Sequence, residues 1–187
     1  MPRSSWVKSR TTPRQHGSQL ISVRRLLIGA VLCFAAIVCE GIAPAEEPAD
    51  RIVIEKSARR MVLYRDGRKV HEYRVSLGGD PVGPKTRQGD HRTPEGQYFI
   101  EGRNDRSHYY KSLRISYPNE ADLERARRLK VNPGGDIMIH GLPNGQRYIG
   151  PLHRLYDWTE GCIAVTDEEM DEIWSLVEVG TPVQIVP

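Results

Sequence analysis

Two stretches, Ile137-Met-Ile-His140-Gly141 and Trp158-Thr-Glu-Gly161-Cys162-Ile-Ala-Val-Thr166, carry the strongest signal in this sequence. His140 ends an apolar run that predicts a buried strand, which would hold its imidazole rigidly. Cys162 follows a glycine, and because Gly161 has no side chain, a substrate could approach the thiol closely. A thiol becomes a useful nucleophile when a neighbouring histidine takes its proton. Together the two stretches predict a cysteine acyl-transfer site.

Residues 1–45 have the plan of a secretory signal peptide. Arg24-Arg25 precede an apolar run from Leu26 to Val38, and Ala43-Pro-Ala45 offers small residues before Glu46. The apolar run is shorter than the roughly 20 residues that a membrane span needs. We expect an exported protein of the periplasm or cell envelope, with an uncleaved anchor as the alternative.

Removal of this leader would leave Cys162 as the single cysteine, because Cys33 and Cys39 lie within it. A lone thiol in an exported protein has no internal disulfide partner, which marks it as a reactive group. An inert buried cysteine is the alternative reading. The neighbouring Gly161 and the presence of His140 favour the reactive one.

The basic character of the whole chain comes from its N-terminal part. The net charge is +3, but residues 1–45 contain six basic residues and one acidic residue, so residues 46–187 are left with 21 basic and 23 acidic ones. The pI is therefore no indication of nucleic-acid binding. The one basic cluster, between Arg125 and Lys130, is typical of the solvated face and last turn of a helix.

The remainder predicts a short linker, residues 46–50, and one mainly β domain with two helices, residues 51–187. Asp66-Gly67 is a strong hairpin-turn signal between two β-like runs. The segment 78–90 is rich in Gly, Pro, Lys and Asp and predicts a mobile surface loop. Strands are expected at 51–55, 61–64, 70–77, 97–101, 137–140 and 183–186.

Two helices are expected from capping signals and apolar spacing. Asn119 is a candidate N-cap for a helix at 119–130, with Leu123, Ala126 and Leu129 on one face. Thr166-Asp-Glu-Glu169 is a capping-box pattern, and it is followed by apolar residues at helical spacing at 170, 173, 174 and 177.

These motifs resemble those of the L,D-transpeptidases, bacterial cell-wall enzymes with a YkuD-type catalytic domain. The similarity lies in His140-Gly141 followed by Thr159-x-Gly161-Cys162, in Arg92-Thr-Pro-Glu-Gly96, and in Pro133-Gly-Gly-Asp-Ile-Met-Ile-His140. It covers about residues 51–186. Asp157-Trp-Thr-Glu-Gly-Cys162 is similar to the "DWTxGC" motif of a small-domain subgroup. The resemblance implies a β-sandwich-like fold.

The resemblance also implies roles for individual residues. Cys162 matches the nucleophile, His140 the general base, Gly161 with Cys162 the oxyanion-binding N–H groups, and Gly141 the residue whose carbonyl orients the base. The implied substrates are peptidoglycan stem peptides, cleaved at the L,D bond before a terminal D-alanine. A side-chain amine from a second stem, or a wall-linked lipoprotein, would resolve the thioester. The resemblance implies no cofactor, nucleic acid or metal. Contact with a membrane is expected only if the leader stays uncleaved.

The sequence departs from the commoner family pattern at three points. Glu160 and Ala164 stand where histidine and arginine are usual, and the segment between His140 and Cys162 is longer than in many members. A carboxylate beside a thiol raises its pKa, so Glu160 must point away, pair with a base, or blunt the nucleophile. Some relatives with the DWTxGC motif hydrolyse the lipoprotein-to-peptidoglycan link, so L,D-amidase or endopeptidase activity stays open beside transpeptidation.

The long segment supplies further candidates for substrate binding: His153, Arg154, Trp158, Thr159 and Glu160. A zinc hydrolase using His91, His140, His153 and Cys162 is an alternative of another class, but no short two-ligand spacing supports it. A non-catalytic wall-binding module is a third, and it would not require a glycine-flanked cysteine facing a histidine.

Overall fold

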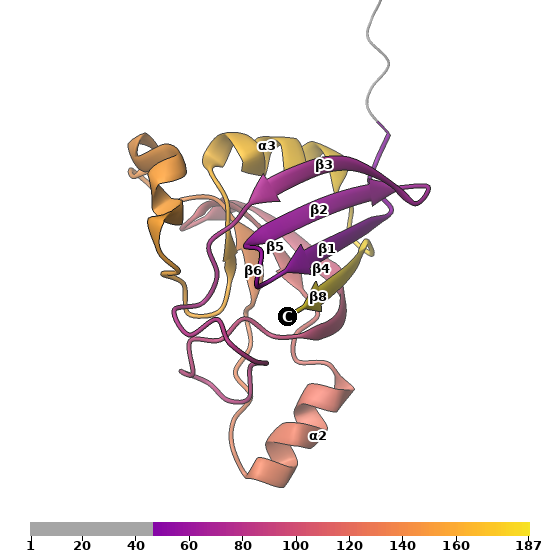
Figure 1. The fold of residues 1–187 in the computed structure, drawn as a ribbon, viewed down its shortest axis with the longest axis vertical. Helices are drawn as coiled ribbons and strands as arrows, with labels where there is room; N and C mark the ends of the chain where they lie inside the picture. The colour runs from indigo at the N-terminus through magenta and orange to yellow at the C-terminus, as the bar shows by residue number, and fades with distance from the viewer. Residues whose placement is uncertain (1–46) are drawn as a thin grey trace, which may run out of the picture. The chain divides into compact units, whose positions relative to one another are not determined.

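Eight strands form one sheet in the order β3-β2-β1-β8-β4-β5-β6-β7 in the computed structural model, which describes residues 47–187 (Figure 1). The expected signal peptide lies outside the described residues. The strands are β1 (Arg51–Glu55), β2 (Arg60–Arg65), β3 (Arg68–Arg74), β4 (Gly96–Ser107), β5 (Tyr110–Ile115), β6 (Met138–His140), β7 (Ile163–Ala164) and β8 (Pro182–Val186).

Two hairpins build the N-terminal edge of the sheet. β1 pairs antiparallel with β2, and β2 with β3. The turn between β2 and β3 places both Asp66 (φ 50°) and Gly67 (φ 73°) in the left-handed region, as a tight primed turn requires. Along β1, Ile52 and Ile54 alternate with more exposed residues and are fully buried. The predicted hairpin is therefore confirmed.

The last strand joins the two ends of the described chain. β8 pairs parallel with β1 on one side and antiparallel with β4 on the other. β4 is longer than expected and belongs to both halves of the sheet: residues 96–99 pair with β8, and residues 100–107 pair with β5. This shared strand lets the sheet fold over one core, with the β1–β3 hairpins lying in front of β5 and β6 (Figure 1). The mainly β, sandwich-like prediction is confirmed.

Both predicted helices form at their capping residues. In α3 (Asp167–Leu176) the Thr166 hydroxyl accepts from the Glu169 N–H, and the Glu169 carboxylate accepts from the Thr166 N–H. Its apolar face, with Met170 and Ile173 fully buried, packs on the sheet beside β5. This packing fixes the segment directly after β7.

α2 (Glu120–Leu129) lies at the opposite end of the domain from α3 (Figure 1). Asn119 caps it in a reciprocal box with Asp122, whose carboxylate also accepts from the Tyr98 hydroxyl at 2.9 Å. The expected apolar face is only partly buried: Ala126 is covered, but Leu123 and Leu129 stay 41% and 54% exposed.

Three parts of the fold differ from the sequence-based expectation. Residues 48–50 are packed on the domain rather than a linker, since Ala49 is buried and donates to the Leu176 carbonyl at 2.7 Å. β5 was not expected. The segment before the nucleophile forms a kinked 3-10 helix, η1 (Arg147–Leu155), which breaks at Gly150. None of the helices within residues 47–187 has the length and apolar character of a bilayer span.

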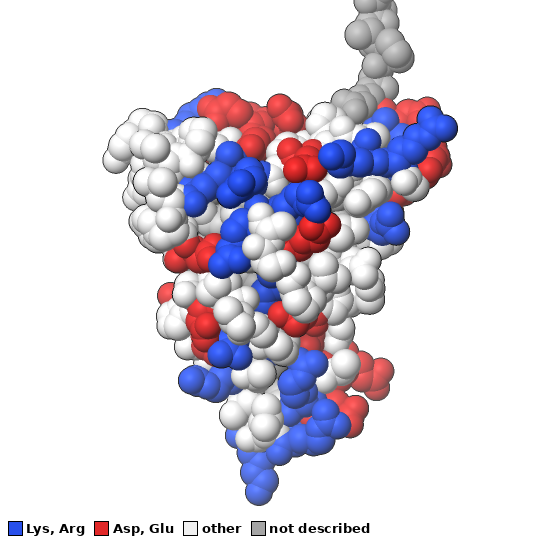
Figure 2. All heavy atoms as spheres, viewed as in Figure 1, with Lys and Arg blue, Asp and Glu red and all other residues white. Residues whose placement is uncertain are grey.

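The surface shows where charges gather. Lys and Arg side chains cluster on the lower end formed by α2, where Arg125 pairs with Asp122 and Arg128 with Glu124 (Figure 2). This is the solvated helix face that the sequence indicates, and two of its arginines pair with acidic residues of the same helix. The area over η1 is instead almost free of charge (Figure 2), and its exposed apolar side chains are Tyr148, Leu152 and Leu155.

Candidate active site

The end of β6 and the start of β7 bring the two chemical stretches together. β6 pairs with β5 on one side and parallel with β7 on the other, with His140 opposite Ala164. Cys162 is the residue before β7, so the parallel register places it beside Met138. The Cys162 thiol donates to the Asp136 carbonyl oxygen at 3.6 Å. His140 and Cys162 thus lie on adjacent segments near one edge of the sheet and line the same cavity.

His140 is fixed by a hydrogen bond at its ring and by the turn that follows it in the chain. Its Nδ1 lies 2.7 Å from the Gly141 carbonyl oxygen, and because a carbonyl can only accept, Nδ1 carries the proton. Nε2 is then the basic nitrogen. The following turn is fixed by Asp167 of α3, which accepts from the Leu142 N–H at 2.8 Å. Gly141 is needed here because a Cβ would lie 2.6 Å from that carboxylate.

Burial sets the protonation state of both groups. His140 is 3% exposed, and burial lowers its pKa to about 4, against the opposing effect of the Gly141 hydrogen bond. Burial also raises the pKa of the Cys162 thiol, although the Met138 N–H and the charge of Lys85 act to lower it. At neutral pH the resting pair is therefore a neutral thiol and a neutral imidazole. The proton must move as the thiol attacks.

Aromatic rings cover the imidazole. The Tyr109 ring centroid lies 4.5 Å from that of His140, and the Trp158 ring meets His140 edge-on at 5.9 Å. Trp158 also contacts the ring of His153. Tyr109 and Trp158 thus fix the orientation of the base and form part of the cavity wall.

The backbone around the nucleophile is shaped by Thr159 and Gly161. The Thr159 hydroxyl donates to the Cys162 carbonyl at 2.7 Å and accepts from the Gly161 N–H at 3.1 Å. Gly161 has φ 125°, and a Cβ there would lie 2.5 Å from the Arg92 carbonyl oxygen. The missing side chain admits the Arg92 backbone, where the sequence had suggested room for a substrate.

The same contacts revise the expected oxyanion donors. The Gly161 N–H is occupied by Thr159, so it does not face a reacting carbonyl. The Cys162 N–H has no partner among the backbone hydrogen bonds of residues 47–187. Of the two N–H groups expected from the sequence, only that of Cys162 is available.

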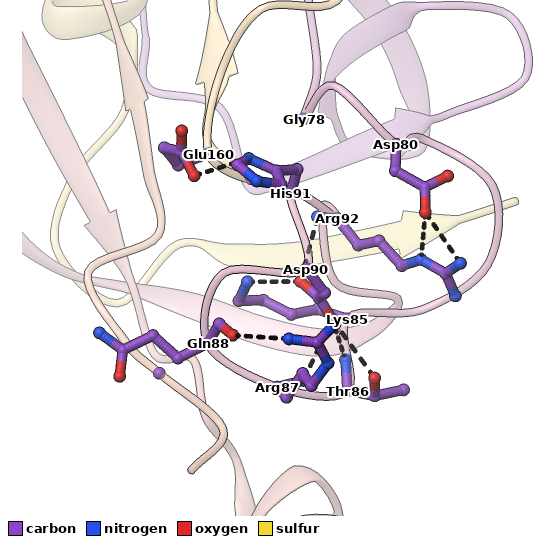
Figure 3. A network of polar contacts seen from close by, with 12 residues as sticks. Gly78, Asp80, Lys85, Thr86, Arg87, Gln88, Asp90, His91, Arg92 and Glu160 are labelled. Atoms are coloured by element: carbon purple, nitrogen blue, oxygen red, sulfur yellow. Dashed lines mark hydrogen bonds and ion pairs between the residues drawn. The ribbon is translucent and has the colours of Figure 1, made fainter. Parts of the chain in front are cut away.

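Glu160 pairs with a histidine from another loop. Its carboxylate lies 2.7 Å from Nδ1 of His91, which belongs to the segment between β3 and β4 (Figure 3). Of the three outcomes considered for this carboxylate, pairing with a base is the one found. The Glu160 side chain is 77% exposed, so its effect on the thiol is screened by solvent.

Two cavities meet at the thiol. The first has a volume of about 460 Å³ and is lined by residues of β4 and the β4–β5 turn, by His140 and by Trp158. The second, of about 340 Å³, is lined by Lys85, Gln88 and the glycines 89, 134 and 135. Cys162, Asp136 and Glu160 line both. The nucleophile is therefore open on two sides.

The expected substrate-binding residues divide into two groups. Trp158, Thr159 and Glu160 line the first cavity. His153 and Arg154 line neither cavity beside Cys162. His153 is 5% exposed with Nδ1 3.2 Å from the Ser76 hydroxyl, and burial lowers its pKa to about 4. Arg154 forms an ion pair with Glu169 of α3. Both side chains hold η1 onto the domain.

Several cavity residues lie outside the sequence-based set. Asn104, Arg106 and Ser107 come from the far end of β4, and Lys85 comes from a loop. Asp157, the first residue of the DWTxGC-like motif, accepts from the Leu77 N–H and from Arg59. The only sequence signal for the loop that carries Lys85 was the Gly- and Pro-rich composition of segment 78–90.

Comparison with known proteins identifies the fold. The model of the YkuD family, the L,D-transpeptidase catalytic domain, matches residues 49–185. This chain belongs to that family.

The chain spans about half the length of the relatives that it matches. YafK, a candidate L,D-transpeptidase of Escherichia coli (strain K12), is 31% identical over 133 residues, which are 67% of this chain and 46% of YafK. A variant of the helical cell shape determining protein Pgp2 from Campylobacter jejuni is 25% identical with a TM-score of 0.57, covering 75% of this chain and 48% of Pgp2. Bd1075 of Bdellovibrio bacteriovorus is 25% identical with a TM-score of 0.52 over the same shares.

Within residues 47–187, no three His, Cys, Asp or Glu side chains are grouped to hold a metal ion. His91, one of the zinc-competent residues in the sequence, is engaged by Glu160.

Proposed function

We propose that this protein is an exported cysteine acyltransferase that exchanges the L,D bond of peptidoglycan stem peptides through a thioester on Cys162. The observation that carries the proposal is the placement of an imidazole, oriented by the Gly141 carbonyl, and a free thiol at the wall of one cavity. Membership of the L,D-transpeptidase family supports the substrate class.

Acylation follows from the protonation states of the pair. His140 Nε2 takes the thiol proton while the sulfur attacks the carbonyl carbon of the L-residue. The Cys162 N–H donates to the oxygen that gains negative charge. The carbon–nitrogen bond then breaks, the leaving D-residue takes the proton from His140 as its amine departs, and a thioester remains on Cys162.

Transfer to an acceptor reverses these steps. An amine of a second stem loses its proton to His140 and attacks the thioester, the carbon–sulfur bond breaks, and the thiolate regains the proton. The two cavities at Cys162 support this sequence because acyl donor and amine need separate routes to the sulfur. Neither half-reaction, as written, requires an oxidant, a metal or a cofactor.

The test is exchange of the terminal residue. Purified protein incubated with a stem tetrapeptide and D-methionine should release D-alanine and form the D-methionine product, followed by mass spectrometry. Cys162→Ala should abolish both products, and Cys162→Ser should retain almost none because a hydroxyl is far less acidic than a thiol.

The outcome separates transferase from hydrolase. If tetrapeptide is only shortened to tripeptide at every D-methionine concentration, the transferase proposal fails and an L,D-amidase using the same two residues replaces it. If Cys162→Ala retains exchange, the assignment of the nucleophile fails.

Export is part of the same proposal. The protein recovered from the cell envelope should begin near Glu46, as measured by mass analysis of its N-terminal peptide. Full-length protein found only in the cytosol would contradict access to peptidoglycan.

A further inference from the structure

Two lysines are buried near the segment between β3 and β4, and they differ in how their ammonium groups are satisfied. Lys56 is 2% exposed and donates to three acceptors: the carbonyls of Gly83 and Thr93, at 2.6 and 2.8 Å, and Glu95 Oε1 at 2.8 Å. An ammonium has three N–H groups, so all of those in Lys56 are used. Lys56 is a structural residue that ties the loop to β1.

Lys85 is equally buried but incompletely bonded. Its side chain is 3% exposed, and among residues 47–187 its ammonium donates one hydrogen bond, to Asp90 Oδ1 at 2.8 Å (Figure 3). Two N–H groups are left over. Burying an ammonium without partners is costly, so these donors indicate an acceptor that is absent from the protein itself.

The position of Lys85 indicates where that acceptor sits. Lys85 lines the 340 Å³ cavity that has Cys162 on its wall, and no hydrogen bond joins the ammonium to the sulfur. The other lining residues include Gly89 and Gly135, beside which a Cβ would meet nothing within 4 Å. The cavity thus has free space, with both a cation and the nucleophile on its wall.

Asp90 does not cancel this cation completely, because its own charge is shared among several donors. Its carboxylate also accepts from the backbone N–H groups of Thr86, Arg87 and Arg92, at 2.7 to 3.1 Å (Figure 3). Burial acts to raise the pKa of Asp90, but the hydrogen bond from Lys85 and those N–H groups hold it well below its usual range. Asp90 is thereby the anchor that fixes Lys85 in place.

The other charges of the cavity lie at its shared rim. Asp136 pairs with Arg114 at 3.4 Å, and Glu160 pairs with His91 at 2.7 Å. Both carboxylates are more than two-thirds exposed, so solvent screens them. Lys85 is the only cation among the lining residues of this cavity.

We propose that Lys85 binds the carboxylate of the D-residue that leaves on acylation, so that the smaller cavity selects stems ending in a free carboxyl group. This inference rests on the proposed acyltransferase function. The terminal carboxylate is one residue from the scissile carbonyl, so its binding in this cavity keeps that carbonyl at Cys162. The larger cavity then receives the rest of the stem, and departure of the D-residue frees the smaller one as the route for the amine.

The experiment compares a stem tetrapeptide with a free terminal carboxyl group and its C-terminal amide. A charge-assisted hydrogen bond to a carboxylate predicts that wild-type kcat/KM is about 10- to 100-fold higher for the free acid. Lys85→Met should bring that ratio close to one by lowering kcat/KM for the acid alone. Lys56→Met, the matched control, should lower the melting temperature and keep the ratio.

Each outcome decides between readings. If Lys85 stabilised the thiolate instead, Lys85→Met would slow both peptides equally and also slow alkylation by neutral iodoacetamide, and the carboxylate proposal would be overturned. Equal rates for acid and amide in wild type would overturn it as well, while leaving the proposed function intact. Failure of wild type to process either peptide would overturn the proposed function and, with it, this inference.

A second variant covers loss of folding. If Lys85→Met leaves Asp90 buried without its partner and does not fold, Lys85→Met/Asp90→Asn removes both charges together. The double variant should show the same ratio near one. Retention of the wild-type ratio in a folded double variant would exclude Lys85 as the carboxylate site.

Discussion

Acidification from pH 7 to pH 5 should destabilise the domain through two buried histidines, His140 and His153. Both are at most 5% exposed, and burial lowers the pKa of each from 6.5 to about 4. A histidine with a lowered pKa in the folded state costs no stability above pH 6.5, where both states are neutral. Below pH 6.5 the unfolded chain binds a proton that the folded state refuses, so stability falls until about pH 4.

The magnitude follows from the two pKa values. One pKa unit corresponds to about 1.4 kcal/mol, so each histidine should lower the free energy of unfolding by about 2 kcal/mol between pH 7 and pH 5. The two together give about 4 kcal/mol, a large part of the 5–15 kcal/mol typical of a domain. Most carboxylates stay ionised in both states over this range, which isolates the histidine contribution.

Urea unfolding followed by tryptophan fluorescence at pH 7, 6 and 5 measures the effect. His140→Gln and His153→Gln should each remove about half of the pH dependence, whatever their stability at pH 7, because each deletes one titrating group. Unchanged pH dependence in both variants, or wild-type stability that rises on acidification, would refute the reasoning.

Three further predictions concern the site itself. The acylation rate by stem tetrapeptide should stay level from neutrality to about pH 5 and fall towards pH 4, because burial lowers the pKa of the base His140 to about 4. His140→Ala should lower the rate about a hundredfold. An acid limb near pH 6.5 in folded protein would contradict the buried base. Gly161→Ala should cost about 2–4 kcal/mol by thermal unfolding because of its φ of 125° and the Arg92 carbonyl, whereas Gly102→Ala, with no neighbour within 4 Å, should change little. Glu160→Gln should raise the rate of Cys162 alkylation at pH 7, by no more than about threefold, because the lost charge is exposed and screened; a slower rate would show that the carboxylate assists the thiol.

Local patterns in the sequence were enough for most of the fold. The Asp66-Gly67 turn, the Asn119 and Thr166 caps and the alternation of Ile52 and Ile54 each depend on neighbouring residues, so the elements they begin or end could be predicted. β5 escaped prediction because its residues Tyr110–Ile115 are buried only through pairing with β4 and β6, which are distant in sequence.

The candidate nucleophile and base were also evident from the sequence, because a glycine-flanked cysteine and a histidine in family motifs carry their own chemistry. The environment of these two residues could not be predicted from the sequence. The pKa of His140, the occupation of the Gly161 N–H by Thr159, and the pairing of Glu160 with His91 depend on segments that meet only after folding.

The sequence by itself determined the family, the mainly β class and the pair Cys162 and His140, because short motifs and residue spacing encode them. Only the tertiary structure decided which side chains reach the thiol. In the folded domain, His153 and Arg154 hold η1 in place and do not line the cavities at the thiol. Lys85, which lies 77 residues before Cys162 in the chain, lines the second cavity beside the thiol. The physical reason is that burial, desolvation and hydrogen-bond competition are set by contacts between distant segments, which no local pattern records.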